Sequence, residues 1–186
     1  MYEIIIIVSL AVIFAVLIRK WPLTKETKIS DLSDINYLKE GERYFADQNY
    51  QEAEKYYIKA ISLEPKNSLP YGRLGIIYSK NEDLRKAKEL FLVAIKLDPK
   101  NGFYQNNLGS ILLNIGKYQE AVLYLENAVG IDSGVAKRWM NLAICFEKMK
   151  KYSRAKEAIR KAIKLEPGNS KYSKILEHIK NLENES

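Results

Sequence analysis

The sequence has little of what catalysis and metal binding require. Of its 186 residues one is a cysteine and one a histidine. The single cysteine, Cys145, excludes an intramolecular disulfide framework and any zinc or iron–sulfur site built from several cysteines. The single histidine, His178, excludes a histidine-pair metal site, and no glycine-rich phosphate-binding motif is present. We therefore expect no enzyme activity, no cofactor and no metal.

Long apolar runs are absent too, except for one at the N-terminus. The run from Ile4 to Ile18 is apolar apart from Ser9. Extended by its flanks from Met1 to Trp21, it would give a helix of about 31 Å, enough for a hydrocarbon core of about 30 Å. Because Pro22 would end that helix, we predict a transmembrane anchor over residues 1–22 and a polar linker over residues 23–33.

A cleaved signal peptide is the rival interpretation of this run. It requires positive charge before the apolar stretch, whereas Glu3 is the only charged side chain there, and it requires a small-x-small cleavage site, which is missing. Basic residues instead follow the run, beginning with Arg19 and Lys20. By the positive-inside rule, we expect a single-pass membrane protein with its N-terminus out and the rest of the chain facing the cytoplasm, or the stroma if it is plastid-encoded.

The remainder of the chain repeats with a period of 34 residues. Pro65, Pro99 and Pro167 lie on one such grid. Four units follow without insertion or deletion, and a C-terminal capping helix completes the series; these are residues 34–67, 68–101, 102–135, 136–169 and 170–186.

Small and large apolar residues recur at fixed positions inside each unit. Position twenty is Ala53, Ala87, Ala121 and Ala155; position eight is Gly41, Gly75, Gly109 and Ala143; position twenty-four is Tyr57, Phe91, Leu125 and Ile159. Positions twenty and twenty-four are four residues apart, which is the spacing of neighbours on one face of a helix. Each unit is therefore predicted to form two amphipathic helices, A and B.

This pattern resembles the tetratricopeptide repeat (TPR) family. The fourth unit matches the family motif with Trp139, Leu142, Ala143, Phe146, Ala155, Ile159, Ala162 and Pro167. The resemblance implies an all-α fold, a right-handed α-α superhelix (TPR solenoid), here preceded by a single transmembrane helix. Two departures stand out: Gln105 replaces the first aromatic residue of unit three, and Ser133-Gly134 replaces a proline turn, which predicts a looser joint between units three and four.

The resemblance also implies a groove lined by the A helices that holds a peptide segment or a helix of a partner protein. The residues that it places in this peptide-binding groove are Leu38, Glu42, Phe45, Leu69, Ile76, Lys80, Phe103, Asn106, Ser110, Leu113, Asn114, Lys137, Met140, Ile144 and Lys148. So many apolar groups in water would indicate an interaction site, although some could instead pack between helices. The Asn106 and Asn114 amides could hydrogen-bond a peptide backbone.

Some TPR proteins hold acidic chaperone tails with a clamp of lysine, asparagine and arginine. Here Leu38 and Glu42 occupy the first pair of clamp positions, and Phe103 and Asn107 the last. Capture of a chaperone tail is therefore not expected.

Charge is concentrated in unit four, whose ten basic and three acidic side chains give a surplus equal to the net charge of the whole chain, +7. Its second helix is predicted to carry a basic face; the residues are Lys150, Lys151, Arg154, Lys156, Arg160, Lys161 and Lys164. Such a face could contact anionic lipid or an acidic protein, or simply be solvated. No nucleic-acid partner is expected, because no recognition motif accompanies it.

These observations favour a membrane-anchored, non-enzymatic interaction scaffold. It would capture a peptide segment of a client or of a membrane-complex subunit, as an assembly factor for a membrane-associated complex. The alternative is a peripheral lipid-binding or self-assembling structural TPR protein that uses the basic face of unit four.

Overall fold

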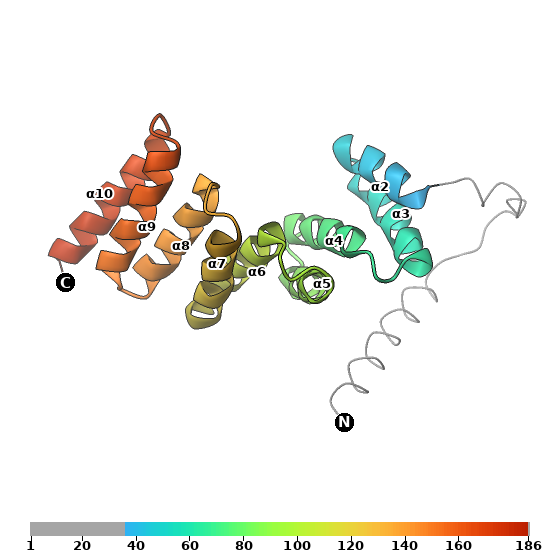
Figure 1. The fold of residues 1–186 in the computed structure, drawn as a ribbon, viewed down its shortest axis with the longest axis horizontal. Helices are drawn as coiled ribbons and strands as arrows, with labels where there is room; N and C mark the ends of the chain where they lie inside the picture. The colour runs from blue at the N-terminus through green and yellow to red at the C-terminus, as the bar shows by residue number, and fades with distance from the viewer. Residues whose placement is uncertain (1–35, 186) are drawn as a thin grey trace, which may run out of the picture. The chain divides into compact units, whose positions relative to one another are not determined.

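The computed structural model describes residues 36–185, which form only α-helices, turns and loops (Figure 1). Within this range no helix is long and apolar enough to cross a membrane. The predicted anchor over residues 1–22 and the linker over residues 23–33 lie outside the described residues.

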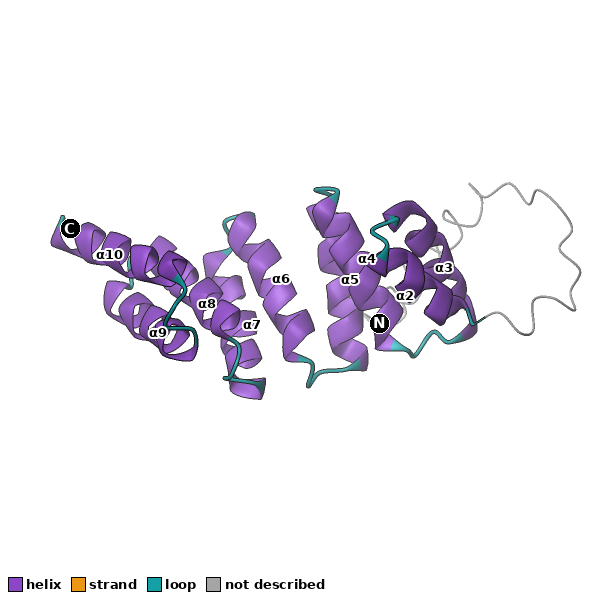
Figure 2. Cartoon of the chain, turned by 90° about the horizontal axis from the view of Figure 1, so that it is seen from above, coloured by secondary structure: helices purple, strands orange, loops and turns teal. Residues whose placement is uncertain are grey.

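The described helices alternate between A and B along the chain. They are α2 (Tyr37–Ala46), α3 (Tyr50–Leu63), α4 (Ser68–Lys80), α5 (Leu84–Leu97), α6 (Gly102–Asn114), α7 (Tyr118–Ile131), α8 (Ala136–Lys148), α9 (Tyr152–Leu165) and α10 (Ser170–Asn184). Each helix packs on the next one in sequence, so residues 36–185 stack in chain order (Figure 2). The A helices are α2, α4, α6 and α8, and α10 follows as the last helix.

Asparagine side chains cap three of the four A helices of the described chain and also α10. Asn36, Asn67, Asn101 and Asn169 each accept a hydrogen bond from a backbone N–H in the first turn of the following helix. Such caps satisfy donors that the helix itself leaves unpaired. Val135 takes the equivalent place before α8 and provides no side-chain cap.

Glycine at position eight lets the A and B helices of one unit approach closely. A Cβ atom added at Gly75 would lie 2.8 Å from the Phe91 ring, and one added at Gly109 would lie 2.6 Å from Leu125 Cγ. Phe91 and Leu125 are fully buried at these contacts. The recurrence of small position-eight residues opposite large position-twenty-four residues therefore arises from this packing.

The turn between the A and B helices requires a left-handed backbone at position fifteen. Gly116 has φ +78° there, and three non-glycine residues adopt the same region: Gln48 at +58°, Glu82 at +62° and Lys150 at +57°. A side chain in this region carries a steric cost that glycine avoids.

Two clusters of buried side chains form the core. One lies in units one and two around Tyr57, and the larger one continues from unit two to α10. Four tyrosines of units one and two pack in this core: Tyr37 and Tyr57 are buried, and Tyr44 and Tyr78 pack against the cluster of units one and two. Aromatic residues at these positions are therefore part of the core.

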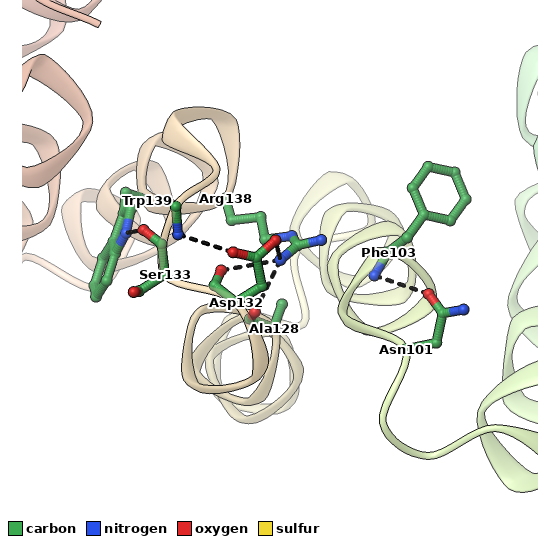
Figure 3. Close-up of polar contacts among 8 residues, drawn as sticks. Asn101, Phe103, Ala128, Asp132, Ser133, Arg138 and Trp139 are labelled. Atoms are coloured by element: carbon green, nitrogen blue, oxygen red, sulfur yellow. Dashed lines mark hydrogen bonds and ion pairs between the residues drawn. The ribbon is translucent and has the colours of Figure 1, made fainter. Parts of the chain in front are cut away.

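The joint between units three and four is tied by side chains of α8, as Figure 3 shows. Arg138 donates from Nη1 to the carbonyl oxygen of Asp132 at 2.9 Å, and the same nitrogen lies 2.8 Å from the Asp132 carboxylate. Trp139 donates from Nε1 to the carbonyl oxygen of Ser133 at 2.8 Å. These contacts hold the joint together, and the looser joint expected at Ser133-Gly134 finds no support in them.

The Trp139 contact belongs to a series of equivalent hydrogen bonds. The Tyr71 hydroxyl donates to the carbonyl oxygen of Pro65 at 3.1 Å, and Gln105 donates from Nε2 to that of Pro99 at 3.3 Å. In each case the position-four side chain reaches the residue six places earlier. Gln105, although not aromatic, supplies the donor that this position requires.

Candidate functional site

The predicted groove residues lie on the A helices, and the surface that they line is here called the A-helix face. Most of its apolar members are partly covered by neighbouring helices, the alternative that the sequence left open. Phe103 is exposed at 43%, whereas Met140 is buried at 7%. The others are half-buried, namely Leu38, Phe45, Leu69, Ile76, Leu113 and Ile144. The reason is packing between neighbouring units, since all of these except Leu69 contact one of the two core clusters.

Glu42 is not a free carboxylate on this face. Arg73 of the next A helix donates to its carboxylate from Nε at 2.8 Å and from Nη2 at 2.6 Å, and the Tyr57 hydroxyl donates at 2.6 Å. Sequence reasoning missed Arg73. Its place in the repeat could have predicted the contact. Arg73 is at position six of unit two and Glu42 at position nine of unit one, and these two positions face each other across neighbouring units.

These contacts fix the charge state of Glu42. Burial alone would raise its pKa, but the hydrogen bonds from Arg73 and Tyr57 and the positive charge of Arg73 outweigh burial and hold the pKa of Glu42 below its usual value. For Tyr57, burial and the hydrogen bond to Glu42 both raise the pKa. The three side chains therefore form a charged network that joins units one and two at neutral pH.

A second polar network lies further along the A-helix face. The Asn141 amide donates to Oδ1 of Asn106 at 3.0 Å and to the Ser110 hydroxyl oxygen at 2.9 Å. Asn106 is buried at 8%, and its side-chain oxygen is already used by Asn141. The physical reason is the approach of α8 to α6, which brings Asn141 within reach of both side chains. Asn114, by contrast, is exposed.

This network still leaves hydrogen-bonding capacity for a ligand. Within residues 36–185, the side-chain NH₂ of Asn106 and the side-chain carbonyl of Asn141 have no hydrogen-bond partner, and neither atom is fully buried. The Asn106 NH₂ is a donor and the Asn141 carbonyl is an acceptor. Together they could pair with a C=O and an N–H of a bound peptide. The exposed ring of Phe103 lies on the same helix as Asn106.

The three lysines of the A-helix face are exposed. Lys80 lies over the ring of Tyr50 at 5.2 Å, and Lys148 lies 3.3 Å from the carboxylate of Glu147. Lys137 has no ion pair among the described residues. Glu147 is itself buried at 8%, and His178 on α10 lies 3.9 Å from the same carboxylate.

The predicted basic face lies on α9 and in the turn before it. Lys150, Lys151, Arg160 and Lys164 are exposed and have no ion pair within the described part of the chain. Lys156 is an exception to the predicted exposure, because it is half-buried and paired with Glu183 of α10. The remaining two, Arg154 and Lys161, are paired with Glu126 at 2.6 Å and with Glu157 at 3.0 Å.

Cys145 is fully buried in the core. Burial raises the pKa of its thiol to about 11, so it is protonated at neutral pH and a poor nucleophile. Its sulfur donates to the carbonyl oxygen of Tyr118 at 3.4 Å. Among residues 36–185 no three side chains of the metal-binding types are grouped so that they could hold an ion.

The repeated helix pairs, the small-on-large contacts within each unit and the periodic hydrogen bonds define a helical-repeat protein. Three tetratricopeptide repeat family models match consecutive parts of the chain, over residues 44–108, 104–134 and 136–169. The chain belongs to the tetratricopeptide repeat family. No curated protein matches it.

Solved structures share this fold. MamA 41-end from Desulfovibrio magneticus RS-1 superimposes with a TM-score of 0.74 at 24% identity, covering 80% of this chain and 84% of that chain. YrrB, described as a TPR protein with an unusual peptide-binding site, gives 0.73 at 19% identity and covers 81% and 77%. The first TPR of Spaghetti, bound to an HSP90 peptide, gives 0.61 at 21% identity and covers 62% and 91%.

Proposed function

We propose that this protein is a protein-interaction scaffold that binds an extended segment of a partner protein on the A-helix face. The observation that carries the proposal is the fixed pair of amides, Asn106 and Asn141, with one unused donor and one unused acceptor. An extended peptide has unpaired N–H and C=O groups along its length, and such groups need partners when they are bound. YrrB and Spaghetti, which share the fold, are described with peptide-binding sites or a bound peptide.

Fixed amides suit this role better than mobile ones. Asn141 donates two hydrogen bonds to its neighbours, so its carbonyl is already oriented before a ligand arrives. A preorganised site loses less conformational entropy on binding. Phe103, as the one exposed large apolar side chain of the predicted groove, would supply an aromatic contact for a side chain of the bound segment.

The test is site-specific photo-crosslinking with the full-length chain in its native membranes. Benzoylphenylalanine replaces Phe103, and a matched probe replaces Glu89, an exposed residue of α5. A discrete crosslinked partner is expected from position 103 alone. Asn141→Ala should reduce the yield of this crosslinked product at least fivefold. Equal crosslinking from both positions, or a band indifferent to Asn141→Ala, would refute binding on the A-helix face.

The finer role that we propose is an assembly factor for a membrane-associated complex. It rests on the apolar run of residues 4–18. An anchor would confine the A-helix face to the membrane surface and so raise its effective concentration beside membrane-bound partners.

Alkaline extraction of native membranes tests the anchor. The natural chain should stay in the membrane pellet, whereas a variant with Ile7→Arg and Ile13→Arg should move to the supernatant, because charged residues in the hydrocarbon core are costly. Release of the natural chain by carbonate would overturn this part of the proposal and leave peptide binding untouched.

A further inference from the structure

A cleft of about 220 Å³ opens between α7, α8 and α9. Its aromatic and aliphatic floor comes from α8, and its charged rim comes from α7 and α9. The α8 residues that line it, Trp139, Leu142 and Phe146, differ from those that α8 contributes to the A-helix face, which are Lys137, Met140, Ile144 and Lys148. The cleft is therefore a separate site on another side of α8.

The size of the cleft limits what it can hold. Pockets for small molecules and cofactors measure about 300–1,000 Å³, and this cleft is smaller. It is large enough for one bulky side chain that projects from a protein partner. The Trp139 indole N–H already donates to Ser133, so the floor offers ring faces and has no free indole donor.

Two cations now cover that floor. The Arg154 guanidinium lies 4.1 Å from the centre of the Phe146 ring, and the Lys161 ammonium lies 4.4 Å from that of Trp139. Both side chains are about half exposed. Exposed ion pairs and cation–π contacts are weak, so an apolar side chain can replace these cations over the rings at little cost.

The rim of the cleft carries basic and acidic side chains, and their balance indicates the charge of a partner that could bind there. Arg154, Glu157, Lys161 and Lys164 are spaced three or four residues apart and so share one side of α9. Glu126 and Glu157 are the only carboxylates among the residues that line the cleft, and Arg154 and Lys161 already neutralise them. Lys164, which follows Lys161 by three residues on the same side of α9, is exposed and has no ion pair in the described part of the chain, so its positive charge is not neutralised.

One repeat earlier the rim positions are apolar. Leu92 and Leu123 precede Glu126 and Glu157 by one period of 34 residues. They are exposed at 41% and 62%. A protein segment that crossed the B helices would therefore meet exposed leucines before it reached the cleft, and its own apolar side chains could pack on them.

We propose that the cleft binds an acidic protein segment, with one bulky apolar side chain of that segment seated on Trp139 and Phe146 and its flanking carboxylates paired with Arg154 and Lys161. The site is independent of peptide binding on the A-helix face.

Trp139 is itself the reporter for a test. The chain has two tryptophans, so Trp21→Phe leaves the Trp139 emission alone in the otherwise full-length protein. Three nine-residue peptides serve as probes: a central phenylalanine flanked by glutamates, a central alanine flanked by glutamates, and a central phenylalanine flanked by lysines. The first should change the Trp139 emission saturably, and the other two should need at least tenfold higher concentrations.

Substitutions test whether the change in Trp139 emission comes from peptide bound in the cleft. Lys161→Glu and the milder Lys161→Gln should weaken binding of the first peptide, by at least tenfold for the glutamate variant, whereas Arg85→Glu, an exposed change on α5, should leave it unchanged. Asn141→Ala should also leave it unchanged, which separates this site from the A-helix face. Circular dichroism melts of each variant verify folding.

Four outcomes would overturn the proposal. They are equal binding of the three peptides, binding indifferent to both Lys161 variants, an emission change with phosphatidylserine vesicles but not with the peptide, and a change that depends only on protein concentration. The third would assign the cleft to anionic lipid, and the fourth to a second copy of this chain.

Discussion

Arg73 joins unit two to unit one through both oxygens of the Glu42 carboxylate, with Nε at 2.8 Å from one and Nη2 at 2.6 Å from the other. The same pair of repeat positions is linked further along the chain, where Asn141 donates to Ser110 at 2.9 Å. Position six of one unit thus contacts position nine of the unit before it. Since repeat proteins gain stability from each interface between neighbours, these contacts strengthen particular joints of the stack.

Glu42→Gln should therefore weaken the first joint. The variant keeps the shape of the side chain but removes the charge that Arg73 and Tyr57 contact, and hydrogen bonds to charged groups contribute about 1.5–3 kcal/mol. We expect the free energy of unfolding in urea to fall by about 1–2 kcal/mol. Glu40→Gln is the control, because Glu40 pairs at 2.8 Å with Arg43 of the same helix, and this pair is largely open to solvent; a loss of less than about 0.5 kcal/mol is expected.

The same pair of proteins should differ in its response to acid. The pKa of Glu42 in the folded state is below its usual value of 4.5, so its contribution to stability is complete above pH 4.5 and is lost as the pH falls through the folded-state pKa. The difference in unfolding free energy between the natural chain and Glu42→Gln should therefore be constant near neutral pH and shrink below pH 4.5. A difference that grows on acidification would contradict the assigned network.

Asn141→Ala should disturb the A-helix face more than Asn107→Ala. Asn141 makes two hydrogen bonds to another unit, whereas Asn107 donates to the carbonyl oxygen of Phe103 within its own helix at 2.7 Å. We expect a loss of about 1–2 kcal/mol for Asn141→Ala and less than about 0.5 kcal/mol for Asn107→Ala. Chemical denaturation measures both, and equal losses would mean that the contact between units contributes little.

The repeat pattern predicted much of this fold. Alanine and glycine at fixed positions predicted two helices per unit, and the contact of Gly75 with Phe91 shows why a small residue recurs there. Such contacts depend on helix geometry within one unit, and the period of the sequence reports that geometry directly. Gln105 departs from the family motif, yet it keeps the hydrogen bond that the side chains at this position make.

The candidate site was harder to predict because it depends on contacts between units. Periodicity places Asn106 and Met140 on one side of their helices, but how far the next unit covers them depends on the distance between units. The structure shows both to be nearly buried. Likewise, the sequence gives no sign that Arg154 and Lys161 lie over aromatic rings of another helix.

Two glycines of unit three should respond oppositely to alanine. At Gly109 the new Cβ would meet Leu125 Cγ at 2.6 Å, whereas at Gly130, also helical, nothing lies within 4 Å. Overpacking costs about 1–3 kcal/mol, so Gly109→Ala should destabilise by that amount. Gly130→Ala should stabilise by about 0.5–1 kcal/mol, since alanine is the better helix former. Thermal unfolding followed by circular dichroism separates the two, and a stabilised Gly109→Ala would contradict the close packing.

The turns between the A and B helices allow a stabilising change. Lys150 has φ +57° and is exposed, so Lys150→Gly removes the steric cost of a side chain in the left-handed region. The cost is about 1 kcal/mol, and part of it is offset because glycine makes the unfolded chain more flexible. We expect a gain of about 0.5 kcal/mol for Lys150→Gly. Gly116→Ala, at φ +78° with open space around it, should lose about 1 kcal/mol. Opposite shifts in the urea midpoint would show that backbone strain, rather than the lysine charge, governs this position, whereas a loss on Lys150→Gly would mean that its side chain contributes more than the strain.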